Sequence, residues 1–352
     1  MKTESRNLLV VASNWLGDAV MSLPLLGFMS GLPGARVTVL AQGYTARVFW
    51  GIDQVHRLVV LAKDGPTRRL WKRMRSLHAL GFHGAVVLPP SFSSALTTFL
   101  GRVPHRVGFA GDGRGLLLSE ASPSGNLRRE HLSENYLRLG RVLSRRLQLG
   151  DAHDRGTPVI RVFGHERDQV KSILESQGAP PGDYAVVVPG ATYGETKAWP
   201  QKEYRNLVGR LRGEMPVVLA GGSGERRLCE VVAEGLKGVY NLAGLTTLGE
   251  LFALLEGGRV LVANDSGAPH AAASLGTPVV VIFGSTSPTW TRPLGDVVRV
   301  VREPVHCAPC FRKKCPTHLE CYQGISADDV FAESISAIGR AAGSSGARAR
   351  YS

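Results

Sequence analysis

The stretch Leu8–Ala12, LLVVA, leads directly into SNWLGDAV at residues 13–20. The apolar run predicts a buried strand, and the helical spacing of the apolar residues after it predicts a helix with one buried face. Asp18 therefore lies at a strand-to-helix turn. In a parallel sheet such turns lie at the carboxyl ends of the strands, where ligands bind.

Eight apolar runs of this kind occur, four in each half of the chain. They are Leu8–Ala12, Val37–Leu40, Leu58–Leu61 and Ala85–Leu88, then Tyr184–Val188, Val217–Ala220, Leu261–Ala263 and Val279–Phe283. Apolar strands that alternate with helices indicate parallel sheets covered on both faces. A chain of 352 residues suits two such domains. We predict an α/β protein with two Rossmann-like, doubly wound domains facing a central cleft, where the ligands should bind.

The expected boundary lies in the Pro- and Gly-rich stretch GAPPGD, residues 178–183, which is the candidate linker. The first domain is then 1–178, the second 179–342, and residues 343–352 read as a flexible tail. The composition, 43% hydrophobic and 20% charged, is that of an ordinary folded protein. No apolar stretch approaches the roughly 20 residues of a spanning helix, and the start lacks a secretory signal. We expect a cytoplasmic location.

Almost all of the net charge of +13 lies in the first half. Residues 1–150 hold 20 Lys and Arg against 8 Asp and Glu, whereas residues 151–352 hold 22 against 21. A basic half suggests a polyanionic partner: nucleic acid, anionic lipid or a phosphorylated glycolipid. The sequence has no recognisable nucleic-acid-binding module, so we expect no nucleic acid partner. The alternative is a merely soluble basic surface.

Three motifs contain candidate site residues. Asp18, next to Gly17, could act as a general base or merely cap its helix. In VPGATYGETKAWP, residues 188–200, Lys197 could hold a diphosphate or be an ordinary solvated charge, and the spacing excludes a Walker loop. The third is VANDSGAPHAAA, residues 262–273, a strand end and helix start typical of phosphate sites. There Asp265 could accept from sugar hydroxyls, and His270 is a ligand contact or a buried structural residue. Residues 284–288, GSTSP, offer a second such helix start.

Together these motifs resemble the ADP-heptose:lipopolysaccharide heptosyltransferases, glycosyltransferase family 9, and among them heptosyltransferase II. The resemblance covers nearly the whole chain and implies a GT-B fold. It assigns the base role to Asp18. It assigns donor binding to Thr192, Lys197, Glu225, Asp265, Ser266, Gly267 and His270, with Glu225 at the adenosine ribose. One departure is Pro269, where the family more often has Met.

The resemblance further implies an inverting transfer of L-glycero-D-manno-heptose from ADP-heptose to the lipopolysaccharide inner core, as the second heptose. The acceptor would be Kdo-lipid A or heptosyl-Kdo-lipid A, at the cytoplasmic face of the inner membrane. No cofactor is expected, and no Asp-x-Asp motif indicates an essential metal. The alternatives are a GT-B transferase of another nucleotide sugar and a non-catalytic nucleotide-sugar-binding protein, against which Asp18 argues.

Two segments leave alternatives open. In RRLWKRMRSL, residues 68–77, the cations Arg69, Lys72 and Arg73 could bind the anionic acceptor or form a solvated helix face. Four cysteines follow the pattern C-x2-C-x4-C-x5-C, at Cys307, Cys310, Cys315 and Cys321. They could hold a structural metal, remain reduced thiols or form a disulfide.

Overall fold

The computed structural model describes residues 5–61, 75, 77–125, 127–191 and 193–343, and the chain divides into two compact units, Met1–Arg161 and Val162–Ser352. The boundary expected from the sequence is later, at residue 178. The segment between the two boundaries is helix α6 (Gly164–Ser176), which packs on α9 (Leu248–Gly257) of the second unit. An ion pair of 2.7 Å between Arg167 and Glu256 joins these two helices.

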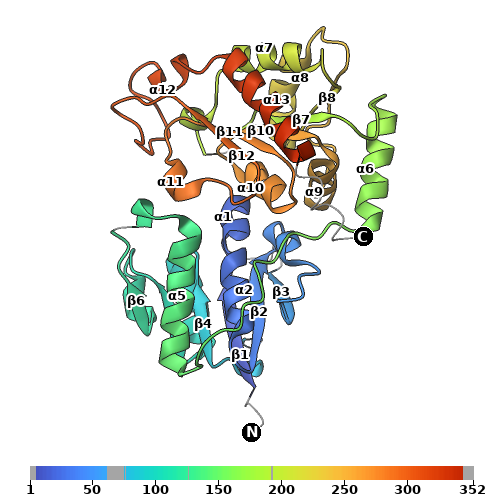
Figure 1. Cartoon of the computed structure of the whole chain (residues 1–352). Helices are drawn as coiled ribbons and strands as arrows, with labels where there is room; N and C mark the ends of the chain where they lie inside the picture. Colours follow the sequence, from blue (N-terminus) through green and yellow to red (C-terminus); the bar gives the residue numbers. More distant parts are fainter. Residues whose placement is uncertain (1–4, 62–74, 76, 126, 192, 344–352) are drawn as a thin grey trace. The chain divides into compact units, whose positions relative to one another are not determined.

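The first unit contains a parallel six-stranded sheet with the order β3-β2-β1-β4-β5-β6 (Figure 1). Its strands are β1 Arg6–Val11, β2 Ala35–Gln42, β3 Arg57–Leu61, β4 Gly84–Val87, β5 His105–Phe109 and β6 Glu120–Ser122. Its described helices are α1 Leu16–Met21, α2 Leu23–Gly31, α4 Phe92–Leu100 and α5 Leu132–Leu147, with short 3-10 turns at η1 Thr45–Phe49, η2 Arg114–Leu117 and η3 Leu127–Arg129.

Helices cover both faces of this sheet. Helices α2 and α5 lie side by side on one face, and Gly84 of β4 contacts Leu143 of α5 there (Figure 1). On the other face the alternate residues Ala85 and Val87 pack with Ala95 of α4. Burial on both faces explains why these strands are continuous apolar runs.

The second unit repeats this plan, with the strand order β12-β11-β10-β7-β8-β9, all parallel (Figure 1). Its strands are β7 Ala185–Val188, β8 Val217–Leu219, β9 Val239–Asn241, β10 Val260–Asn264, β11 Val279–Phe283 and β12 Val298–Arg302. Besides α6 and α9, its helices are α7 Gln201–Leu211, α8 Arg226–Ala233, α10 Gly267–Ser274, α11 Pro288–Thr291, α12 Glu320–Gln323 and α13 Ala327–Gly343, with 3-10 turns at η4 Glu195–Lys197 and η5 Ser223–Glu225.

The second core forms on both sides of its sheet. Helices α7, α8 and α13 pack on one face, where Val187, Val262 and Ile282 are fully buried with Tyr204 of α7. Helices α9 and α10 contact each other, and α10 packs on β10 and β11. The predicted α/β class, with two parallel doubly wound sheets, is confirmed. Among the described residues, no helix is long and apolar enough to cross a membrane.

Candidate active site

The carboxyl end of β10 positions Asp265, whose carboxylate is the central acceptor of the site in the second unit. Asp265 follows the last residue of this strand and is 4% exposed. Lys197 donates to its Oδ2 atom at 2.7 Å, and Thr286 donates to the same oxygen at 2.6 Å. Thr291 lies 3.4 Å from Oδ1. The sequence suggested that Asp265 could accept from sugar hydroxyls, and that stays a prediction; in the structure, Lys197 and these two threonines are placed at its carboxylate oxygens.

At the same edge of the sheet, Asn264 holds the segment 189–199, called here the Lys197 turn. Its side-chain oxygen accepts from the backbone N–H of Trp199 at 3.0 Å, and its amide nitrogen donates to the carbonyl of Pro189 at 2.8 Å. The side chain is completely buried. Because one buried amide ties both ends of the turn to β10, the Lys197 amine has a fixed approach to Asp265.

Helix α10 begins just after Asp265, where the sequence predicted a helix start, and so lies beside this ion pair. Ser266 is its N-cap residue, with no side-chain capping bond, and its buried Oγ atom has no hydrogen-bond partner among the described residues. Gly267 opens the helix, and Pro269 is accommodated in its first turn, where the missing N–H costs nothing. His270 is buried in that turn. Free N–H groups and the helix dipole favour an anion here.

Glu225 lies at the same carboxyl edge of the second sheet, in η5, which follows β8. Its Oε2 atom accepts from the backbone N–H of Gly222 at 2.7 Å, and its carboxyl group lies against Gly190 at the end of β7. A Cβ atom at Gly190 would be 1.7 Å from Oε1, so a larger residue here would displace the Glu225 carboxyl group from this position. Oε1 makes no hydrogen bond within the described residues and can accept from a ligand hydroxyl.

In the first unit, Asp18 is the third residue of α1, at the carboxyl end of β1. Ser13 donates to its Oδ2 atom at 3.2 Å, and the residue is half-buried. The N-cap residue is Trp15, which is 58% exposed. Tyr136 of α5 is buried near Asp18, and burial together with the negative charge of Asp18 raises the pKa of its hydroxyl. Asp18 is thus placed where a ligand hydroxyl can reach it.

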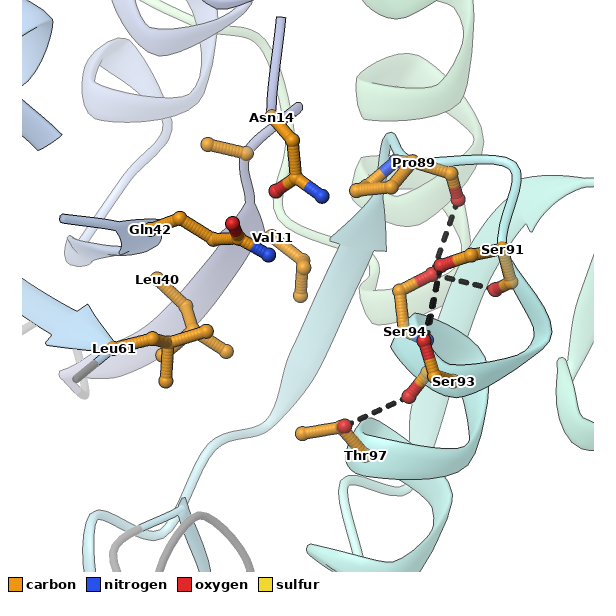
Figure 2. A pocket seen from close by; sticks show the side chains of 11 residues that line it. Val11, Asn14, Leu40, Gln42, Leu61, Pro89, Ser91, Ser93, Ser94 and Thr97 are labelled. Atoms are coloured by element: carbon orange, nitrogen blue, oxygen red, sulfur yellow. Dashed lines mark hydrogen bonds between the residues drawn. The ribbon is translucent and has the colours of Figure 1, made fainter. Parts of the chain in front are cut away.

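A pocket of about 50 Å³ opens at this edge, where the order of the strands reverses between β1 and β4 (Figure 2). Its lining residues are Val11, Ala12, Asn14, Leu40, Gln42, Leu61, Pro89, Ser91, Ser93, Ser94 and Thr97. The amides of Asn14 and Gln42 lie on one side, and the serine hydroxyls at the start of α4 lie on the other. None of the lining residues is charged, so the pocket suits a neutral, hydroxyl-bearing ligand.

Buried Arg114 holds the wall of this pocket. Its guanidinium donates to the carbonyl of Pro89, which also accepts from Ser94 Oγ at 3.1 Å, and it donates to the carbonyl of Phe109 at 2.7 Å. Burial lowers the pKa of Arg114, while the charge of Asp112 opposes this effect. The pocket wall is therefore fixed in part by Arg114, a side chain that does not itself line the pocket.

Residues 68–320 match the family model described as glycosyltransferase family 9 (heptosyltransferase). The chain belongs to this family. Lipopolysaccharide heptosyltransferase 2 of Salmonella typhimurium strain LT2 is 29% identical over 307 residues, which cover 84% of this chain and 87% of that protein. Lipopolysaccharide heptosyltransferase 1 of Pseudomonas aeruginosa strain PAO1 is 28% identical over 330 residues, 87% of this chain and 86% of that protein.

A solved structure agrees with these relatives. That of Escherichia coli ADP-heptose lipopolysaccharide heptosyltransferase II superposes with a TM-score of 0.77 at 26% identity, covering 95% of this chain and 99% of that one. The predicted family, the resemblance to heptosyltransferase II and the GT-B class of fold are confirmed. As a member of family 9, the chain is a glycosyltransferase.

Four of the predicted site residues lie outside the described residues. They are Thr192 of the donor motif and Arg69, Lys72 and Arg73 of the basic segment. The other donor residues divide into two groups. One group consists of Lys197 in η4 with Asp265, Ser266, Gly267 and His270 at the start of α10; Glu225, in η5 after β8, forms the other.

The cysteine segment contacts the donor motif, which the sequence analysis did not predict. All five cysteines are free thiols; Cys307 is exposed and Cys321 is buried. Within the described part of the chain, no group of three or more His, Cys, Asp or Glu side chains is arranged to hold a metal. The backbone N–H of Cys315 donates to Glu195 Oε1 at 3.1 Å, and the hydroxyl of buried Tyr322 donates to the carbonyl of Thr196 at 3.1 Å.

Proposed function

We propose that this chain is an inverting glycosyltransferase that moves L-glycero-D-manno-heptose from ADP-heptose to the lipopolysaccharide inner core, as the second heptose. The family match and the relatives named heptosyltransferase 2 support this choice. The observation that carries it is the buried pair of Lys197 and Asp265 beside the Ser266 Oγ atom at the start of α10, which has no hydrogen-bond partner in the described part of the chain. This arrangement suits the diphosphate of a nucleotide sugar.

The second unit binds the donor. The N–H groups from Gly267 onward and the Ser266 hydroxyl contact the phosphates, and Lys197 faces the same charge. Asp265 holds Lys197 in place, and Glu225 accepts from the ribose hydroxyls. Thr192 and His270 complete the donor contacts. These charges and dipoles are fixed before the reaction, so they stabilise the departing ADP without reorganisation.

The first unit supplies the base. Asp18 takes the proton from an acceptor heptose hydroxyl, and the resulting oxygen nucleophile attacks the anomeric carbon of the donor heptose. The bond from that carbon to the ADP oxygen breaks, and the electron pair leaves with the diphosphate. Ser13, which donates to one carboxylate oxygen, orients the other toward the acceptor. A single displacement of this kind inverts the anomeric centre.

The acceptor, heptosyl-Kdo-lipid A, combines a neutral sugar with anionic groups. The uncharged pocket of Asn14, Gln42 and Ser91 suits the sugar ring. Arg69, Lys72 and Arg73 then bind the carboxylates and phosphates of the inner core. The basic first half favours the anionic cytoplasmic face of the inner membrane, with the protein attached peripherally. Nucleic acid has no part in this function.

A substrate panel tests the proposal. The purified protein is incubated with ADP-heptose, UDP-glucose or GDP-mannose, together with Kdo-lipid A or heptosyl-Kdo-lipid A, and nucleotide release and product mass are measured. We expect transfer only with ADP-heptose and at the higher rate with heptosyl-Kdo-lipid A. Faster transfer to Kdo-lipid A would move the activity to the first heptose. Transfer from another nucleotide sugar alone would contradict the proposed donor.

A further inference from the structure

The charge of Lys197 is already balanced within the protein. Its amine lies 2.7 Å from Asp265, and both side chains are largely buried, with 18% and 5% exposed. The pair contributes almost no net charge to a ligand. The start of α10 adds about half an elementary charge. Each phosphate of the donor carries a negative charge, so the family motif alone leaves the diphosphate short of positive charge.

A second basic segment is fixed against this motif. Residues 311–315, FRKKC, form hydrogen bonds with the Lys197 turn through their backbone. Tyr193 donates from its hydroxyl to the carbonyl of Phe311 at 3.0 Å, and Thr196 donates to the carbonyl of Arg312. The N–H of Phe311 donates to the carbonyl of Ser285 at 2.9 Å. With the contact of Cys315 to Glu195, these bonds tie the segment at both ends.

Of the three cations in this segment, Lys313 is directed to the donor motif. Its amine lies 5.6 Å from the centroid of the Tyr193 ring, and the Lys197 amine lies 5.2 Å from the same centroid. The two amines are therefore at most about 11 Å apart. A Cβ atom on Gly194 would come within 2.6 Å of the Lys313 carbonyl, so glycine permits this close approach.

We propose that Lys313 is a second cation for the donor diphosphate and supplies the charge that Asp265 withdraws from Lys197. This inference rests on the proposed function. The ring of Tyr193 contacts the Lys313 amine. The hydroxyl of the same residue donates to the backbone of the segment at Phe311. Lys313 is exposed, and no carboxylate among the described residues forms an ion pair with its amine. Lys314, the next residue, is also exposed and provides a matched control.

Calorimetric titration with ADP and with adenosine tests this role. We expect Lys313→Ala to weaken ADP binding about tenfold, as for a lost charged hydrogen bond, and Lys313→Glu to weaken it further. Lys313→Arg should stay within about threefold of wild type, because the charge remains. Lys314→Glu, with the same change in charge, should stay within about twofold. Adenosine, which lacks phosphates, should bind all variants equally.

Each other outcome has a definite meaning. Equal ADP affinity in Lys313→Glu and Lys314→Glu would overturn the role of Lys313 and leave the proposed function standing. A parallel loss of adenosine binding would also overturn it, because the residue would then act only on the local fold. If the wild type binds no ADP, the proposed function itself fails. Lys313→Ala, which introduces no charge, is the deciding variant if Lys313→Glu does not fold.

Discussion

The carboxyl edges of the two sheets differ in how they use charge. In the second unit, Asp265 is buried and accepts from Lys197 and Thr286, and α10 begins beside it. In the first unit, the pocket is lined by apolar side chains, amides and hydroxyls, and no charged residue lines it. The same doubly wound architecture thus positions a charged network at one edge and a neutral pocket at the other.

The two edges have different tasks in the proposed reaction. Negative charge develops on the departing diphosphate, and fixed charges and dipoles stabilise it best when they need no rearrangement. The acceptor sugar gains little charge until Asp18 takes its proton, so neutral hydrogen bonds suffice to orient the ring. On this account, variants at the second edge affect donor binding and variants at the first edge affect the acceptor step.

The largest effect is expected at Asp18. Asp18→Ala should lower the turnover number about a thousandfold, because general-base catalysis is worth two to four orders of magnitude. ADP affinity, measured by calorimetry, should stay within about twofold of wild type. Asp53→Ala is the control, since Asp53 is an exposed carboxylate of the same unit, paired with Arg161 at 3.1 Å. Turnover within a few fold of wild type would remove Asp18 from the mechanism.

Lys197→Met should show the opposite pattern. Loss of the amine leaves buried Asp265 unpaired and removes charge from the donor site, so kcat/KM for ADP-heptose should fall about 100-fold or more. ADP binding should weaken in parallel. Lys202→Met, on the exposed side of α7, is the control. Undiminished ADP affinity in Lys197→Met would break the contrast between the two edges.

A smaller, salt-dependent effect is expected in the basic segment of the first half. Arg69→Glu with Arg73→Glu should raise the acceptor KM at least tenfold and leave the donor KM within about twofold, because each cation near an anionic surface contributes about 1 kcal/mol. Added NaCl should raise the acceptor KM of the wild type in the same direction.

The matched control for this pair is Arg141→Glu with Arg145→Glu on α5, which changes the charge of the same unit equally at exposed positions. If both double variants raise the acceptor KM equally, only the net charge of the unit matters. An unchanged acceptor KM at low salt in the Arg69 and Arg73 variant would mean that the acceptor binds elsewhere.

The smallest expected effect concerns the reactivity of the cysteine thiols and does not involve turnover. Hydrogen bonds from Thr317 lower the pKa of the Cys315 thiol, whereas burial raises the pKa of Cys229 to about 12 and that of Cys321 to about 11. A lower pKa gives more thiolate at a given pH, and thiolate is the reactive form. Iodoacetamide at pH 7.5 should therefore label Cys315 before Cys229 and Cys321, as measured by peptide mass spectrometry. Earlier labelling of Cys229 would contradict this order.

The sequence predicted the strands that are buried on both faces and missed most of those that are not. All eight apolar runs are strands, from β1 to β11. β6, β9 and β12, which were missed, lie at or near the sheet edges and are half-exposed, so polar residues interrupt their apolar character. β5, which was also missed, begins with His105 and Arg106 and has only a short apolar part.

The sequence predicted the individual residues of the site and did not predict which of them contact one another. Lys197 and Asp265 stand out in their motifs, but their ion pair joins residues 68 positions apart and depends on the parallel register of β7 with β10. The roles of Thr291 and Tyr193 could not be predicted, because both arise where one loop packs against another. Such contacts leave no periodic signal in the sequence. Lys313 was hidden for the same reason.

In the proposed reaction, the protein's own charges stabilise the departing diphosphate. The most direct test measures ADP release from ADP-heptose with heptosyl-Kdo-lipid A after dialysis against EDTA, and again with excess Mg²⁺ or Mn²⁺. We predict equal rates under both conditions, since Lys313 and the start of α10 supply the positive charge, while Lys197 neutralises the buried Asp265 carboxylate beside them. Activity that is lost in EDTA and restored only by the divalent cation would contradict the account.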